Sequence, residues 1–226
     1  MPLALASVLL AASAAAIDID ATDRTALDDA PLVAPFGARS PQVIVAWIDS
    51  EASLSETGAA AMVEEVDAVF RSIGIRAEVL RAAPGEPIDA VDGIVVPVVA
   101  RQRQPRSLRS DHVMGLVLRD HVAPSPAWVF VDNVRATLGG GTTARQLGLA
   151  VGRVVAHEVI HALAPGHPHA SRGLMAPALD RLGLLGRRRP PDPECVRAVL
   201  AGLVALSAVR PAASPEPAGL ARNLLR

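Results

Sequence analysis

Two histidines flank a short stretch that begins with a glutamate, in the order His157-Glu158-Val159-Ile160-His161. A helix has about 3.6 residues per turn, so positions i and i+4 lie on one face and both imidazoles can bind one metal ion. Glu158 lies next to the first histidine and can act on a water molecule at that metal. The types and the spacing of these residues therefore predict a hydrolytic metal centre on a helix.

A third histidine, His167, follows the end of this predicted helix and would complete a set of three imidazoles. Three histidines leave a fourth position open, which is typical of catalytic rather than structural zinc sites. His169 is the alternative third ligand. The competing interpretation is a core helix whose histidines bond to backbone or water. That interpretation does not explain why three of the six histidines fall at ligand spacing.

The stretch 157–177 resembles the metzincin signature of zinc endopeptidases, H-E-x-x-H-x-x-G-x-x-H followed by a Met-turn. Met175 lies eight residues after His167, in Gly-Leu-Met-Ala-Pro, and this spacing is most similar to the matrixin branch. The resemblance implies Zn²⁺ bound by His157, His161 and His167, with Glu158 as general base. It also implies that Met175 lies beneath the ligands and that the substrate is a peptide or protein.

One position departs from this signature, because Ala164 stands where the family has glycine. Pro165 disfavours helical backbone at Ala164, so the helix should end near Leu163, and Gly166 can supply the permissive turn instead. The departure keeps open a catalytically impaired metzincin-like module that binds zinc or protein. A zinc hydrolase of another class, with an acidic third ligand such as Asp180 or Glu194, is a weaker alternative.

The composition of the 226-residue chain fits one domain with tails and excludes several classes of function. The chain is 50% hydrophobic with a net charge of −1, so we expect a sizeable core and no nucleic-acid partner. The single cysteine, Cys195, excludes an internal disulfide and a cysteine-bearing zinc site. The chain has no tyrosine, so it lacks the tyrosine that some metzincins place near the zinc.

The two ends of the chain are predicted to lie outside the catalytic domain. Residues 1–16 form an apolar run ending in small residues, which predicts a signal peptide and a secreted or periplasmic protein; otherwise the protein is cytoplasmic. The run is too short for a stable membrane span, which needs about 20 residues. Residues 17–40 are predicted as a linker or short pro-segment and 210–226 as a disordered tail. The catalytic domain then spans 41–209, with an upper part 41–166 and a lower part 167–209.

The order of apolar patterns predicts an α/β (α+β) fold. Strands are predicted at 42–48, 75–80, 93–99, 113–118 and 127–134, and helices at 53–73, from Thr142 or Thr143 to about 163, and at 194–207, with a weak helix at 178–185. The metzincin resemblance implies a twisted, mixed, mostly parallel sheet with a backing helix and an active-site helix. It also implies a small, mostly irregular or helical C-terminal subdomain. Strand 113–118 is the candidate antiparallel strand that binds an extended substrate.

Three further features carry weaker predictions. The arginine-rich stretch 101–109 is predicted as a solvated loop. His112 and His121 flank the candidate cleft strand, and each is predicted to be a surface or packing histidine rather than a second metal ligand. Gly148 and Gly152 within the long helix are expected to let that helix lie close against the sheet.

Overall fold

The structure is a computed structural model that describes residues 41–49, 51, 53–83, 94–101, 103, 113–117 and 124–209. All of them belong to one compact unit, Pro35–Arg226. The predicted signal peptide, linker and tail lie outside the described residues, as do His112, His121 and most of 101–109. Among the described residues, no helix combines the length and the apolarity that a membrane span requires.

A five-stranded sheet forms the centre of the fold. Its strands are β1 (Gln42–Ile48), β2 (Arg76–Ala82), β3 (Ile94–Arg101), β4 (Gly115–Val117) and β5 (Ala127–Phe130), in the spatial order β2-β1-β3-β5-β4. Neighbouring strands run parallel except β4, which pairs antiparallel with β5 at the edge. The predicted mixed, mostly parallel sheet with one antiparallel strand is therefore confirmed.

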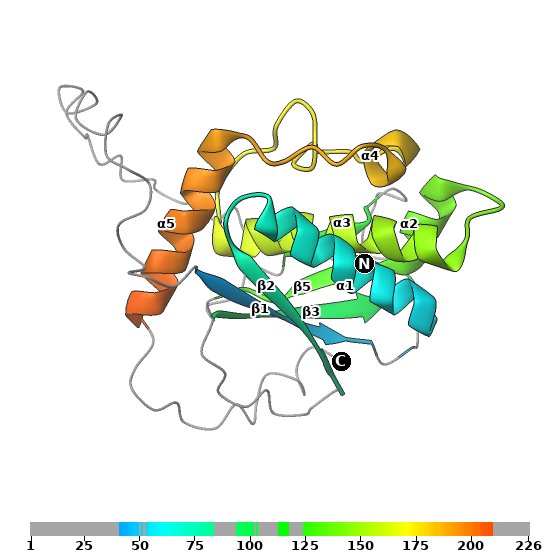
Figure 1. Ribbon diagram of the computed structural model, residues 1–226, viewed down its shortest axis with the longest axis horizontal. Coiled ribbons are helices and arrows are strands. Elements are labelled where there is room, and N and C mark those ends of the chain that lie inside the picture. The colour runs from blue at the N-terminus through cyan, green and yellow to red at the C-terminus, as the bar shows by residue number, and fades with distance from the viewer. Residues whose placement is uncertain are drawn as a thin grey trace, which may run out of the picture. The chain divides into compact units, whose positions relative to one another are not determined.

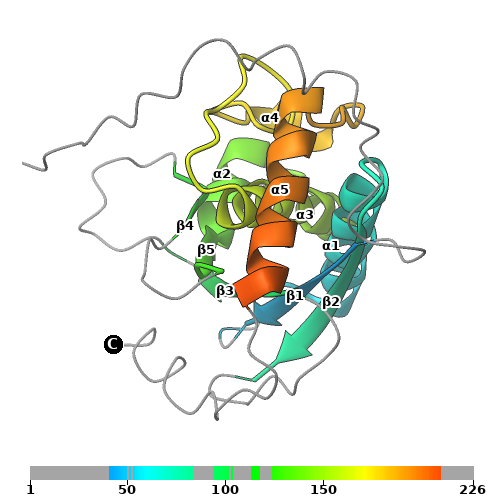
Figure 2. The same ribbon diagram turned by 90° about the vertical axis from the view of Figure 1, so that its left-hand side faces the viewer.

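In the part of the chain that the structure describes, five helices accompany the sheet: α1 (Glu56–Arg71), α2 (Val131–Leu138), α3 (Ala144–Leu163), α4 (Arg181–Leu185) and α5 (Pro193–Val209). The helices α1 and α3 lie side by side over one face of the sheet (Figure 1). They correspond to the predicted backing helix and active-site helix. The helix α5 crosses the C-terminal end of α3 (Figure 2), where Gly202 lies against the Leu163 carbonyl.

The core lies between the sheet and the pair α1 and α3. Val43, Val45 and Trp47 alternate along β1 and join this core, as expected for a strand whose side chains point to opposite faces in turn. Ile44 and Ala46 on the other face of β1 are also fully buried. In β3, by contrast, alternate residues of the first half are only half-buried, so the predicted burial of that strand on both faces holds only for its second half.

The predicted strand 127–134 is too long in its second half. The strand ends at Phe130, and α2 begins at Val131. The apolar run is compatible with both structures, but Val131, Val134 and Leu138 recur at helical spacing and all three are buried. A helix that buries this stripe against α3 therefore prevails over continuation of the strand.

The close approach made by Gly148 and Gly152 is to α1, not to the sheet as predicted. A Cβ on Gly148 would lie 2.0 Å from the carbonyl oxygen of Gly58, and one on Gly152 would lie 2.8 Å from that of Met62. Real side chains do not tolerate such separations. The two helices therefore pack backbone to backbone, which holds the helix that bears the histidines firmly against α1.

Replacing Gly148 with Ala should destabilise the protein by about 1–3 kcal/mol, as overpacking of a core does. Helix propensity alone predicts the opposite sign, a gain of about 1 kcal/mol. Urea unfolding would measure the difference. Gly140→Ala is the matched control, because a Cβ on Gly140 would have no described residue within 4 Å. Equal stabilities of the two variants would contradict the close packing of α1 and α3.

Candidate metal centre and active site

The helix α3 positions the two histidines and the glutamate of the motif. Thr143 caps its first turn: its hydroxyl accepts from the Gln146 N–H, and the Gln146 side chain accepts from the Thr143 N–H. This capping box fixes the start of a 20-residue helix. His157 and Glu158 are buried in its last two turns, and His161 is half-buried. The side chains of the motif are thus held by a rigid element.

The turn after α3 decides which histidine reaches the centre. The helix ends at Leu163, as predicted, and Ala164 adopts φ −124°, which is outside the left-handed region that favours glycine. The His167 N–H donates to the Ala164 carbonyl at 3.1 Å, and Gly166 has φ +96°. Proline second and glycine at positive φ third are the features of a type II β-turn. Gly166 therefore supplies the permissive position of this turn, as predicted from the sequence.

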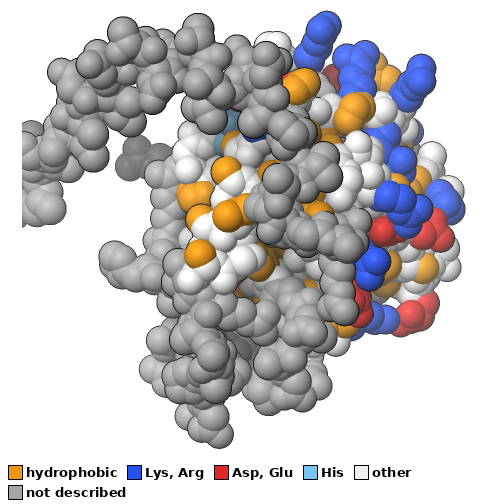
Figure 3. Space-filling view, turned by 60° about the vertical axis from the view of Figure 1, so that its left-hand side comes forward, with side chains coloured by type: hydrophobic (Ala, Val, Ile, Leu, Met, Phe, Trp, Pro, Cys, Tyr) orange, Lys and Arg blue, Asp and Glu red, His pale blue; other side chains and the backbone are white. Residues whose placement is uncertain are grey.

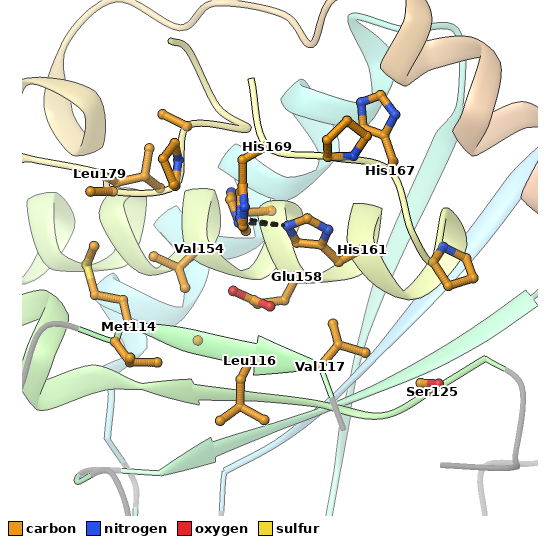
Figure 4. Close-up of a pocket in the computed structure, with 18 of the residues that line it drawn as sticks. Met114, Leu116, Val117, Ser125, Val154, Glu158, His161, His167, His169 and Leu179 are labelled. Atoms are coloured by element: carbon orange, nitrogen blue, oxygen red, sulfur yellow. Dashed lines mark hydrogen bonds between the residues drawn. The ribbon is translucent and has the colours of Figure 1, made fainter. Parts of the chain in front are cut away.

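Three imidazoles meet beside this turn, and they belong to His157, His161 and His169. The Nε2 atom of His161 lies 3.1 Å from Nε2 of His157 and 3.1 Å from Nε2 of His169. One ligand nitrogen from each residue lies within 4.8 Å of the other two, a grouping that can hold a metal ion. Figure 4 shows the His161 and His169 rings pointing toward one another above Glu158.

His167, predicted as the third ligand, is not a member of this group. Its ring points away from the other histidines in Figure 4, although the residue lines the same cleft. The tight turn 164–167 explains the difference, because it uses His167 as its last residue and lets the chain return with His169. The alternative third ligand, His169, therefore stands where His167 was expected.

The segment with the predicted Met-turn supports the first histidine. Nδ1 of His157 lies 2.8 Å from the carbonyl oxygen of Leu174, which can only accept, so Nδ1 carries the hydrogen. Met175 is 1% exposed, and its carbonyl accepts from the Ala170 N–H at 2.8 Å. The contact orients the His157 ring and leaves its Nε2 with a lone pair, the usual arrangement for a metal-binding histidine.

The histidine group fits a metal ion electrostatically. Burial, opposed by the hydrogen bond to Leu174 and aided by the nearby His169, lowers the pKa of His157, so this ring is neutral at neutral pH. A hydrogen on Nε2 of His161 can form a well-aligned hydrogen bond to Nε2 of His157 or to Nε2 of His169, but not to both at once. A cation between the three nitrogens would satisfy all of them. Three imidazole ligands are suited to Zn²⁺ and leave a fourth position open.

Glu158 lies on the β4 side of the histidines, between α3 and the edge strand (Figure 4). A Cβ on Gly115 would lie 2.6 Å from Oε1 of Glu158, so a larger residue at position 115 would displace the carboxyl group from this position. Burial raises the pKa of Glu158 to about 8, and a cation among the histidines would act in the opposite direction. The glutamate is thus a carboxyl group poised to exchange protons near neutral pH.

A cleft of about 1060 Å³ contains the histidine group and Glu158. One wall is the edge strand β4, and the other is formed by α3 and the segments 165–169 and 176–180. Among the described residues, β4 pairs only with β5, so its second edge faces this cleft. An unpaired strand edge beside a metal-binding group can hold an extended chain by main-chain hydrogen bonds.

Two functional contacts were not predicted from the sequence. The Leu174 carbonyl that orients His157 leaves no trace in residue type, since every residue has such a group. Gly115 within a predicted strand was a usable signal, because glycine inside a strand often marks a close approach. The Pro165-Gly166 pair similarly indicated a turn that would displace His167.

The sequence matches no protein-family model, and no curated protein matches it. The structure is similar to that of an archaemetzincin from Methanopyrus kandleri, at 12% identity over 73% of this chain and 96% of the other, with a TM-score of 0.48. It is also similar to a zinc-dependent peptidase from Methanocorpusculum labreanum, at 15% identity over 69% of this chain and 99% of the other, with a TM-score of 0.49. Both similarities are distant, so the function proposed below rests on the residues of this chain.

Proposed function

We propose that the protein is a zinc-dependent endopeptidase that hydrolyses peptide bonds in peptide or protein substrates. The observation that carries the proposal is the meeting of three imidazole Nε2 atoms in one cleft with the buried Glu158. His157, His161 and His169 would hold Zn²⁺. When bound, the ion supplies Lewis-acid chemistry: it acidifies water and polarises a carbonyl group.

The side chains of this chain perform the remaining tasks. Glu158 accepts the proton of the attacking water as general base and delivers it to the leaving amine. Gly115 leaves the space in which that carboxyl group lies. The Leu174 carbonyl keeps the hydrogen of His157 on Nδ1. The edge of β4 that no other described strand pairs with aligns the substrate as an added strand, which gives affinity without strict sequence choice.

The metzincin-like active site is proposed with an altered ligand spacing. The matrixin branch was predicted from the interval between His167 and Met175, and with His169 as ligand that interval shortens by two residues. Membership of that branch and export from the cytoplasm stay predictions. The impaired-module alternative rested on Ala164. Its φ is negative, so this position does not require glycine, which supports the active enzyme instead.

The ligand set can be tested by metal content. We expect His169→Ala to lose most of its zinc on dialysis, because two imidazoles remain where three met. His167→Ala should retain zinc at nearly the wild-type level, since its ring lies outside the group. Atomic emission on dialysed protein would measure both, and unfolding curves would confirm that both variants are folded.

The rate of casein hydrolysis should follow the zinc content of the variants: His167→Ala should be nearly as active as the wild-type protein, and His169→Ala should lose most of its activity. A chelator should abolish cleavage by the wild-type protein, and added zinc should restore it. Cleavage that continues without metal would overturn the proposed function, whereas zinc loss from His167→Ala alone would restore the ligand set predicted from the sequence.

A further inference from the structure

A second cavity lies behind the segment that carries Leu174, and the proposed reaction makes no use of it. It measures about 470 Å³ and lies between the segment 171–174, α4 and the chain that follows α4. Five arginines line it: Arg153, Arg172, Arg187, Arg188 and Arg189. Figure 3 shows basic side chains gathered at the upper right of the view, toward the end of the molecule where α4 lies in Figures 1 and 2.

Two of these arginines are held in place from within the fold. The carboxylate of Glu65, 2% exposed, accepts from Nε of Arg153 at 2.9 Å and from Nη2 of Arg188 at 2.7 Å. Arg153 also donates to the carbonyls of Gly183 at 2.6 Å and Gly186 at 2.7 Å. The cavity thus has a preorganised cationic wall, in which the buried Arg153 and the exposed Arg188 share one buried carboxylate.

The other three arginines add charge that the described residues do not neutralise. Arg172, Arg187 and Arg189 are exposed and form no hydrogen bond or ion pair with another described residue. Asp180 is the acidic residue of the lining, and it accepts from the Gly183 N–H at 2.7 Å. With Glu65 also counted, the five arginines leave an excess of three positive charges around the cavity.

We propose that this arginine cavity binds a multivalent oxyanion, namely a phosphate or diphosphate group. Guanidinium groups present planar pairs of donors that match phosphate oxygens, and they bind these oxygens bidentately. The volume falls within the range of about 300–1,000 Å³ that small-ligand sites occupy. The described residues that line the cavity include no aromatic side chain, so none of them would stack on a nucleobase. The site therefore recognises the oxyanion itself.

The test is isothermal titration calorimetry at fixed ionic strength, in which pyrophosphate is added to the 226-residue protein and the heat of binding is measured. A chelator is present throughout, so that anion bound to a metal ion does not contribute and failure of the zinc proposal does not affect the result. We expect saturable binding at one site. The double variant Arg187→Ser/Arg189→Ser should bind at least about tenfold more weakly, since one charged hydrogen bond is worth that much.

The matched control is Arg76→Ser/Arg197→Ser, which removes the same charge from positions outside the cavity. It should bind within about twofold of the wild-type protein, because remote surface charges are largely screened by salt. Equal weakening in both double variants would reduce the effect to net charge and overturn the site. Absence of binding to the wild-type protein would overturn it too. If an oligoglutamate peptide bound more tightly than pyrophosphate in a competition experiment, the ligand of the cavity would be an acidic peptide, and the phosphate proposal would be overturned.

Discussion

Replacement of Glu158 by Gln should lower kcat for peptide hydrolysis by about 10²–10⁴-fold, the contribution that a general base typically makes. The carboxamide has almost the same shape as the carboxyl group, so it fits the space beside Gly115. It cannot accept a proton from water. The three histidines are unchanged, so the variant should bind zinc like the wild-type protein. Steady-state hydrolysis of a quenched peptide, together with metal analysis, would measure both properties.

The matched control for this variant is Glu194→Gln, an exposed glutamate at the start of α5 outside the cleft. It removes the same charge and should leave kcat unchanged. A Glu158→Gln enzyme that retained wild-type kcat would exclude Glu158 as the base. Loss of zinc from that variant would instead assign the glutamate a role in metal binding.

The first part of the site could be predicted because it lies on one helix. The positions of His157, Glu158 and His161 follow from helical periodicity alone, and the structure places all three in one cleft. The third histidine depends on the path of a turn, and two histidines two residues apart were both available. The turn 164–167 selects His169. The spacing of the histidines does not encode this turn, whose hydrogen bond runs from the His167 N–H to the Ala164 carbonyl, although the Pro165-Gly166 pair does indicate it.

The fold could be predicted to the level of element order for a similar reason. Local periodicity located α1, α3 and α5 within a few residues. It failed at Val131, where the same apolar run suits a strand and a helix, and the packing of α2 on α3 decides. It also could not say which neighbour Gly148 approaches, since a small residue on a helix indicates close packing but not the partner.

Glu65 joins the most buried ion-pair network among the described residues, and its loss should have the largest effect on stability. Glu65→Ala leaves Arg153, 8% exposed, without its carboxylate in the interior. Removal of one partner from a buried pair costs about 3–5 kcal/mol. Glu64→Ala is the matched control, because Glu64 is 63% exposed and pairs with Arg145 at the surface. We expect the control to lose at most about 1 kcal/mol. Urea unfolding at pH 7 would compare the two.

The same network predicts a dependence of stability on pH. Burial alone would raise the pKa of Glu65, but hydrogen bonds from Arg188 and Arg153, with the charges of both, hold it below its ordinary value of 4.5. A lowered pKa in the folded state means that the stabilisation is complete above pH 4.5 and is lost as the pH falls through the folded-state value. The difference between wild type and Glu65→Ala should therefore shrink below about pH 4.5. Two results would show that the carboxylate does not anchor Arg153. One is a difference in the free energy of unfolding that stays constant down to about pH 2. The other is a difference at neutral pH as small as that caused by Glu64→Ala. Arg153 lies one turn before His157 on α3 and donates to the Gly183 and Gly186 carbonyls at α4, so the same loss should loosen the contact between α3 and α4.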